Sequence, residues 1–145
     1  MTGVLRLAVV TALAGTAVTA GAYRLAAGSS SDALGPGTVE VDLDVHYTHF
    51  TPDHLTVRRG TLVRFVVRNH DPIRHELIVG PPEVHARHAA GHEAVHPPVP
   101  GEVSVEPDAT AATVYEFDQV GTVIFACHLP GHDEYGMNGQ VEVVD

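Results

Sequence analysis

The feature that most constrains the fold is a series of short apolar segments, separated by turn-forming residues, that begins near Thr38. In segment 39–45 every second residue is valine or leucine, which is the period of a half-buried β-strand. Many short strands with turns between them are typical of an all-β sandwich or barrel. The expected strands are segments 39–45, 55–57, 62–67, 76–79, 102–105, 110–117, 122–126 and 140–144.

One segment among these strands does not alternate. The stretch from Glu83 to His96 is rich in alanine, glutamate and histidine, and three prolines at positions 97, 98 and 100 follow it. Proline after a run of helix-forming residues marks the end of a helix. We therefore expect a short helical insertion at Glu83–His96.

The N-terminal segment has the pattern of a targeting sequence. Arg6 precedes an uncharged run of apolar and small residues from Leu7 to Ala22, and Ala20-Gly21-Ala22 resembles a signal-peptidase site. Segment 1–22 is therefore either a cleaved signal peptide or, through residues 3–22, an N-terminal membrane anchor. Both interpretations predict an exported, periplasmic or otherwise extracytoplasmic protein. Segment 23–37 is expected to be a flexible linker, and segment 38–145 a single domain.

Charge and cysteine content limit the partners. The formal net charge is -10 at pH 7, which argues against nucleic acid and permits attraction of a basic protein. We expect a monomer with no membrane contact beyond the N-terminal segment. The chain has one cysteine, so it has no intramolecular disulfide. A lone thiol in an oxidising compartment is either buried and inert or holds a metal.

Candidate metal ligands are concentrated in segment 126–137, whose sequence is ACHLPGHDEYGM. Cys127 follows an expected strand, His132 comes five residues later and Met137 five residues after that. A mononuclear blue-copper site uses two imidazoles, one thiolate and a weak axial thioether. The chain's only cysteine and its only methionine besides the initiator share this loop. The loop therefore predicts one type 1 copper ion held by Cys127, His132 and Met137.

The second imidazole must come from another segment. His75 begins the apolar segment 75–79, and a strand end holds a distant ligand rigidly. His70 is the competing candidate, but it lies in the turn 69–72 that precedes this segment. We favour His75 as the fourth copper ligand.

With these residues the chain resembles the cupredoxins, the family of small type 1 blue-copper proteins. The Cys-x4-His-x4-Met loop, with Pro130-Gly131 before the histidine, is most similar to that of rusticyanin-like proteins. Segments 50–69 and 115–127 resemble strands of the family. The resemblance covers about residues 38–145. It implies a Greek-key β-barrel or sandwich of about seven to eight strands, and an electron-transfer protein, not an enzyme, with redox proteins as donor and acceptor.

Two residues depart from the family's pattern. Glu76 stands where many cupredoxins have Asn or Ser, so the sequence does not indicate which groups form hydrogen bonds around the cysteine. His128 directly follows Cys127, as in multicopper enzymes, yet the chain lacks their His-x-His pairs, so a packed or surface residue is expected. Two alternatives to an electron carrier stay open: an exported copper-binding or copper-delivery protein, and the electron-donating subunit of a copper enzyme.

A second metal site is a further hypothesis. His85, His88, His92 and His96 are spaced by three, four and four residues, so a helix would place them on one stripe. Such a stripe could bind Zn(II) or Cu(II). It could equally be a solvated or packed helix face, and Gly91 weakens the helix in its middle.

Overall fold

The computed structural model describes residues 33–91, 95 and 97–145. Our expectations for segment 1–22, for most of the linker 23–37, and for His92 and His96 lie outside the described residues. In the part of the chain that is described, no helix is long and apolar enough to cross a membrane.

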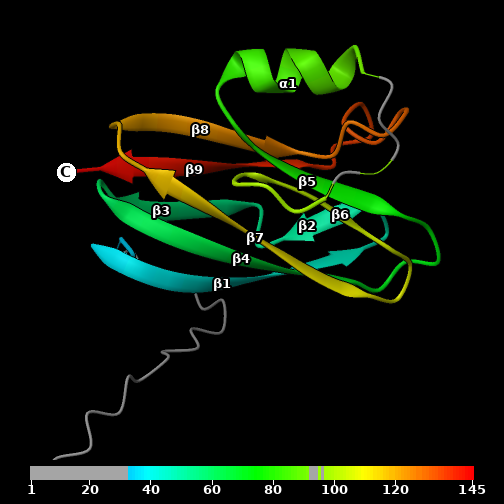
Figure 1. Cartoon of the computed structure of the whole chain (residues 1–145), viewed down its shortest axis with the longest axis horizontal. Coiled ribbons are helices and arrows are strands. Elements are labelled where there is room, and N and C mark those ends of the chain that lie inside the picture. The colour runs from blue at the N-terminus through cyan, green and yellow to red at the C-terminus, as the bar shows by residue number, and fades with distance from the viewer. Residues whose placement is uncertain (1–32, 92–94, 96) are drawn as a thin grey trace, which may run out of the picture.

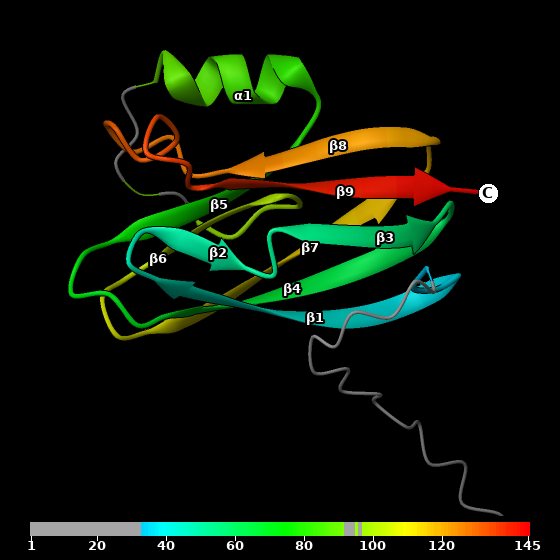
Figure 2. The same ribbon diagram turned by 180° about the vertical axis from the view of Figure 1, so that it is seen from behind.

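Within the described residues, nine strands and one helix form a β-sandwich (Figure 1). One sheet has the order β2-β1-β4-β7 and the other the order β3-β9-β8-β5-β6. Figure 2 shows the same two layers from behind, with α1 outside the sheet that contains β8 and β5. The elements are β1 (Gly37–His46), β2 (His49–Thr51), β3 (His54–Arg58), β4 (Thr61–Asn69), β5 (His75–Gly80), α1 (Pro82–Ala89), β6 (Glu102–Val105), β7 (Thr110–Phe117), β8 (Gly121–Ala126) and β9 (Asn138–Val144).

The expected all-β architecture is confirmed, with two differences in detail. All eight expected strands are present, and the short strand β2 is a ninth that the sequence did not reveal. The helix ends at Ala89, with Ala90 as its C-cap, whereas we expected it to reach His96. Gly91 follows directly, and its N–H donates to the carbonyl of His88, which closes the last turn. The low helix propensity of glycine explains why the helix stops there.

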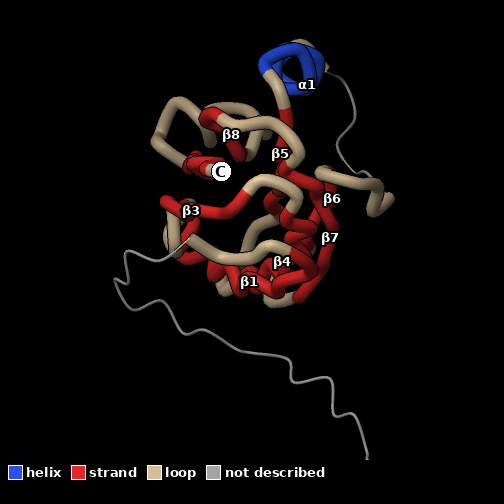
Figure 3. The backbone as a smooth tube through the Cα atoms, turned by 90° about the vertical axis from the view of Figure 1, so that its left-hand side faces the viewer, coloured by secondary structure: helices blue, strands red, loops and turns tan. Residues whose placement is uncertain are grey.

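The buried apolar residues lie between the two sheets, which Figure 3 shows as a backbone tube seen end-on. The buried residues of β1 alternate as expected, because Val41, Leu43 and Val45 face inward. Pairs β1–β4 and β3–β9 are parallel, and the other strand pairs are antiparallel. The antiparallel pairing of β5 with β8 brings the start of β5 and the end of β8 to the same end of the sandwich.

A close contact fixes the end of β8. A Cβ atom added to Gly139 of β9 would lie 2.2 Å from Phe125 Cζ and 2.4 Å from the Asp53 carbonyl oxygen, so only glycine fits there. Phe125 is fully buried, and its ring meets that of Phe50 at a centroid distance of 5.5 Å. Phe125 and Ala126, the last two residues of β8, are therefore held in the core immediately before Cys127.

Candidate metal centre

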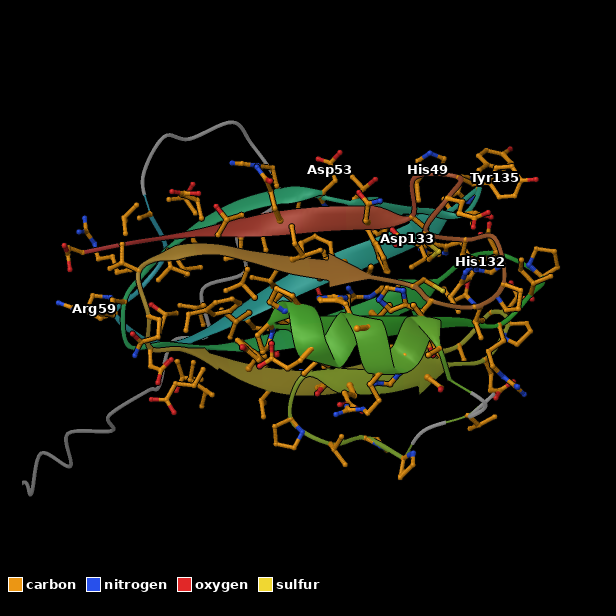
Figure 4. All side chains as sticks on the ribbon, turned by 90° about the horizontal axis from the view of Figure 1, so that it is seen from above. His49, Asp53, Arg59, His132, Asp133 and Tyr135 are labelled. Carbon is orange, nitrogen blue, oxygen red and sulfur yellow. The ribbon has the colours of Figure 1, made fainter. Side chains whose placement is uncertain are left out.

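Three elements converge on one end of the sandwich. His75 is the first residue of β5, Cys127 directly follows β8, and the loop 127–137 leads into β9. Strands β5 and β8 are antiparallel neighbours, with Ile78 opposite Ala126. This register places His75 beside the loop that begins at Cys127. Figure 4 shows His132 at this end of the molecule and Arg59 at the other.

The side chains of His75, Cys127 and His132 meet. The two Nδ1 atoms of the histidines are 3.2 Å apart, and Cys127 Sγ is 3.3 Å from His132 Nδ1. All three ligand atoms lie within 4.8 Å of one another. No other set of three His, Cys, Asp or Glu side chains reaches this proximity among residues 33–91, 95 and 97–145. Two imidazole nitrogens and one sulfur are thus already gathered around one point.

Met137 is held against the other residues of this loop by two backbone hydrogen bonds. Its N–H donates to the carbonyl of His132 at 3.0 Å, and its carbonyl accepts the N–H of Cys127 at 3.1 Å. The side chain of Met137 is fully buried and belongs to the same apolar cluster as that of Cys127. The loop therefore brings the predicted thioether into the same buried cluster as the cysteine.

No family model matches the chain. It is 39% identical over 97 residues to the copper-resistant cuproprotein CopI of Rubrivivax gelatinosus, a match that covers 65% of this chain and 59% of that protein. It is 28% identical over 138 residues to CopI of Pseudomonas aeruginosa, covering 73% and 75%. The chain thus spans less than two thirds of the Rubrivivax relative.

Solved structures are similar over most of the described fold. Auracyanin from Roseiflexus castenholzii matches with a TM-score of 0.60 and 18% identity, covering 73% of this chain and 97% of that one. Auracyanin A from Chloroflexus aurantiacus, a "blue" copper protein, matches with a TM-score of 0.59 and 23% identity, covering 74% and 99%. The chain has the cupredoxin fold. Reduced rusticyanin also matches, with a TM-score of 0.50 and 18% identity over 77% of this chain and 82% of that one.

The orientation of His75 depends on Asp71. The His75 side chain is fully buried, and its Nε2 lies 2.9 Å from Asp71 Oδ2. The carboxylate also accepts the N–H groups of Tyr47 and Thr48, each at 2.8 Å. An ionised Asp71 requires the proton of His75 on Nε2, which leaves the lone pair of Nδ1 directed at Cys127 and His132.

Electrostatics keep Asp71 ionised. Burial acts to raise the pKa of Asp71, but the N–H donors of Thr48 and Tyr47 and the side chain of His75 outweigh it, so the pKa is below its ordinary value of 3.8. The position of Asp71 is fixed in turn by Asn69, whose Oδ1 accepts the Asp71 N–H at 2.9 Å. We expected Asn69 and Asp71 only as residues of the turn 69–72, whereas the structure makes Asn69 the last residue of β4.

The thiol is protonated when no cation is bound. Burial raises the pKa of Cys127 to about 12, although the backbone N–H groups of Glu76 and Leu129 act to lower it. A thiolate at this position therefore needs a positive charge beside it, which a metal ion supplies. The same N–H groups would then donate to the negatively charged sulfur.

Glu76 holds the residue that follows Cys127. Its side chain is buried, and Oε1 accepts the N–H of His128 at 2.8 Å. At the position where many cupredoxins have Asn or Ser, this chain therefore has a carboxylate that accepts a hydrogen bond from the backbone of the loop. His70, the competing ligand candidate, instead pairs with Asp44 at 3.0 Å on the exposed surface. That His75 is a ligand stays a prediction.

The metal-free protein should lose stability as the pH falls below 6.5. Burial is the main cause that lowers the pKa values of His75, His128 and His132 from the ordinary 6.5. The unfolded chain therefore takes up protons at a higher pH than the native state. The resulting stability is present above pH 6.5 and declines as the pH falls through the lower native pKa values. Urea unfolding of the metal-free protein at pH 7.5 and 5.5 tests this, and a His75→Gln variant should show a weaker dependence.

Proposed function

We propose that this cupredoxin binds one type 1 copper ion through His75, Cys127, His132 and Met137 and carries single electrons between redox proteins outside the cytoplasm. The observation that carries the proposal is the convergence of Cys127 Sγ and the Nδ1 atoms of His75 and His132 within 4.8 Å. The similarity to copper-resistant cuproproteins supports copper as the metal. The apolar segment 7–22 and the site at 20–22 support export.

The donor set suits copper chemically. Thiolate and thioether sulfur favour Cu(I), and imidazole nitrogen accepts both Cu(I) and Cu(II). A bound copper ion would supply a one-electron couple between these two states. The protein's own contribution is a set of ligands held in place, of which only His132 is partly exposed: His75 is fixed by Asp71, and Cys127 by the strand end and by two backbone hydrogen bonds. Fixed ligands reduce the rearrangement that accompanies each electron transfer.

Copper storage or delivery is the second candidate function, because the relatives are named for copper resistance. The two functions differ in how fast the metal leaves. A carrier should give a reversible one-electron voltammogram and lose copper to a chelator over hours. A delivery protein should transfer copper within the mixing time of the assay. Rapid loss of copper together with an irreversible voltammogram would reject the electron carrier.

Met137 is expected to set the reduction potential. A thioether binds Cu(I) better than Cu(II), so replacing Met137 with glutamine should lower the potential, and replacing it with leucine should not lower it. Voltammetry of the two copper-loaded variants checks this, with the visible spectrum as a control for an intact site. An unchanged potential in both variants would mean that Met137 is not near the metal.

Electron exchange should occur beside His132. This histidine is partly exposed, and Leu129 and exposed Pro130 lie on the loop before it. We expect Leu129→Lys to slow exchange with a redox partner at least about tenfold, since it places a charge on an apolar contact. The visible spectrum should not change.

The matched control for that experiment is Val120→Lys. Val120 is 54% exposed and lies in the turn between β7 and β8, at the opposite end of β8 from Cys127. This variant adds the same charge to an apolar surface residue far from the loop. Stopped-flow rates that fall equally in both variants, or in neither, would rule out the docking face at Leu129.

A further inference from the structure

A second pair of imidazoles meets at the residue that follows Cys127. His85 of α1 and His128 of the loop bring Nδ1 and Nε2 to a distance of 2.8 Å, with ring centroids 5.1 Å apart. The side chain of His128 is only 6% exposed. This arrangement differs from the helical stripe predicted from sequence, because the partner of His85 comes from the loop and not from α1.

The hydrogen bonds of His85 determine which of its ring nitrogens has a lone pair available to a metal ion. Its Nε2 lies 3.1 Å from the carbonyl oxygens of both Gly80 and Ile124. Carbonyl oxygens only accept, so Nε2 must carry the proton and donate it. The lone pair of His85 is therefore on Nδ1, the atom that faces His128. In the metal-free protein, His128 Nε2–H donates to this lone pair.

The far nitrogen of His128 also has an acceptor nearby. His128 Nδ1 lies 3.8 Å from Asp133 Oδ2. If the His128 proton moves from Nε2 to Nδ1, it faces this carboxylate, and Nε2 gains a lone pair. The shift is between two neutral tautomers, so no proton is gained or lost. Metal-ligating histidines commonly donate their other N–H to a carboxylate or a backbone carbonyl, and both acceptors are present here.

We propose that His85 Nδ1 and His128 Nε2 form a second metal site, for Cu(II) or Zn(II). Two nitrogens that are each about 2.0 Å from one ion are about 2.8 Å apart at the right angle of tetragonal Cu(II), and about 3.3 Å apart at the tetrahedral angle of Zn(II). The observed separation of 2.8 Å matches the Cu(II) geometry, and Zn(II) would require the two rings to move slightly apart. His88 and Glu102 lie next to the pair and could add ligands: the His88 ring stacks on that of His128 at 6.3 Å, and His88 Nε2 is 3.2 Å from Glu102 Oε2.

Glu102 has a competing partner. Its carboxylate also pairs with Arg87, so its use as a ligand would require this ion pair to rearrange. His85 and His128 are therefore the two essential ligands of the proposed site. Neither belongs to the ligand set His75, Cys127, His132 and Met137, so the second site does not depend on the proposed electron-transfer function.

The test is metal titration of the full chain carrying Cys127→Ser, which removes the thiolate of the first site. Isothermal titration with ZnCl2 and with CuSO4 should show one saturable ion. His85→Ala should weaken its binding at least about tenfold, because loss of an outer-sphere partner alone costs a metal site about 10–100-fold. The matched control is His54→Ala, which removes an exposed histidine of β3 and should leave the affinity unchanged.

A second measurement uses the chain with Cys127 intact and one equivalent of copper bound. A further equivalent of Cu(II) should give an electron paramagnetic resonance signal with splitting from two imidazole nitrogens, and His85→Ala should remove it while the visible band of the first copper persists. That band also shows that the variant is folded. No second equivalent, or a second equivalent that His85→Ala binds as tightly as the native chain, would overturn the site.

Discussion

Replacing Cys127 with serine is expected to abolish both the intense visible absorption of the Cu(II) protein and its tight copper binding. The absorption arises from charge transfer between the thiolate and Cu(II), and the chain has no other cysteine to replace it. Copper affinity should fall by at least about a hundredfold, because even residues that only orient a ligand are worth about 10–100-fold. Absorption spectroscopy and competition with a chelator measure the two effects.

Cys127→Ala is the matched control for the effect of the polar serine hydroxyl on stability. Cys127 is fully buried, so the serine hydroxyl costs about 1–3 kcal/mol of stability unless it finds a partner. The alanine variant removes the sulfur without adding this hydroxyl. Both variants should lose the colour, and urea unfolding of the metal-free proteins separates the stability effect. A variant that lacks Cys127 but still gives the coloured Cu(II) protein would refute the assignment.

The strands could be predicted from sequence because burial on one face produces alternation. In β1 the inward residues Val41, Leu43 and Val45 are all buried, as their period of two indicated. Strand β2 has three residues, of which only Phe50 is buried, and so short a segment carries no measurable period. The parallel pairing of β1 with β4 could not be predicted, since pairing depends on the packing of the whole sandwich.

The candidate site was easiest to predict where its residues are close in sequence. Cys127, His132 and Met137 share one loop, and their spacing is by itself enough to indicate a metal site. Asp71 was missed because an aspartate beside a proline in a turn is expected for conformational reasons alone. Its contacts with Tyr47 and Thr48 join residues 24 and 23 positions apart, which only the fold brings together.

The contact between His85 and His128 likewise joins residues that only the fold brings together. The spacing of histidines from 85 to 96 indicated the helix as a ligand surface of its own. The structure ends α1 at Ala89, and the residue that meets His85 is 43 positions away. The side chain of Glu76 was likewise recognised as unusual, but its role as acceptor for the His128 N–H required the loop's conformation.

Removing the carboxylate of Asp71 should weaken both the fold and the metal site. Asp71→Ala leaves the N–H groups of Tyr47 and Thr48 and the Nε2 of buried His75 without their acceptor. Hydrogen bonds to a charged group contribute about 1.5–3 kcal/mol, so we expect a loss of about 3 kcal/mol in the free energy of unfolding of the metal-free protein. Copper affinity should fall about 10–100-fold, because nothing would fix the tautomer of His75.

Asp44→Ala provides a matched control. Asp44 pairs with His70 at 3.0 Å, almost the same distance as the 2.9 Å between Asp71 and His75, but both Asp44 and His70 are about half exposed. An exposed ion pair contributes about 0–1 kcal/mol, so this variant should unfold nearly as the native chain does and bind copper with unchanged affinity. The comparison isolates the effect of burial and of the site from that of losing a histidine–aspartate pair.

The pH dependence of the Asp71→Ala effect gives a further test. The pKa of Asp71 is lower in the native state than its ordinary value of 3.8, so the carboxylate stabilises the fold at pH values above 3.8. This contribution is lost as the pH falls through the native pKa, where the acid is protonated in both states. The difference in unfolding free energy between the native chain and Asp71→Ala should therefore be largest near neutral pH and shrink in acid. A difference independent of pH would show that Asp71 acts through packing, and its proposed role in orienting His75 would have to be abandoned.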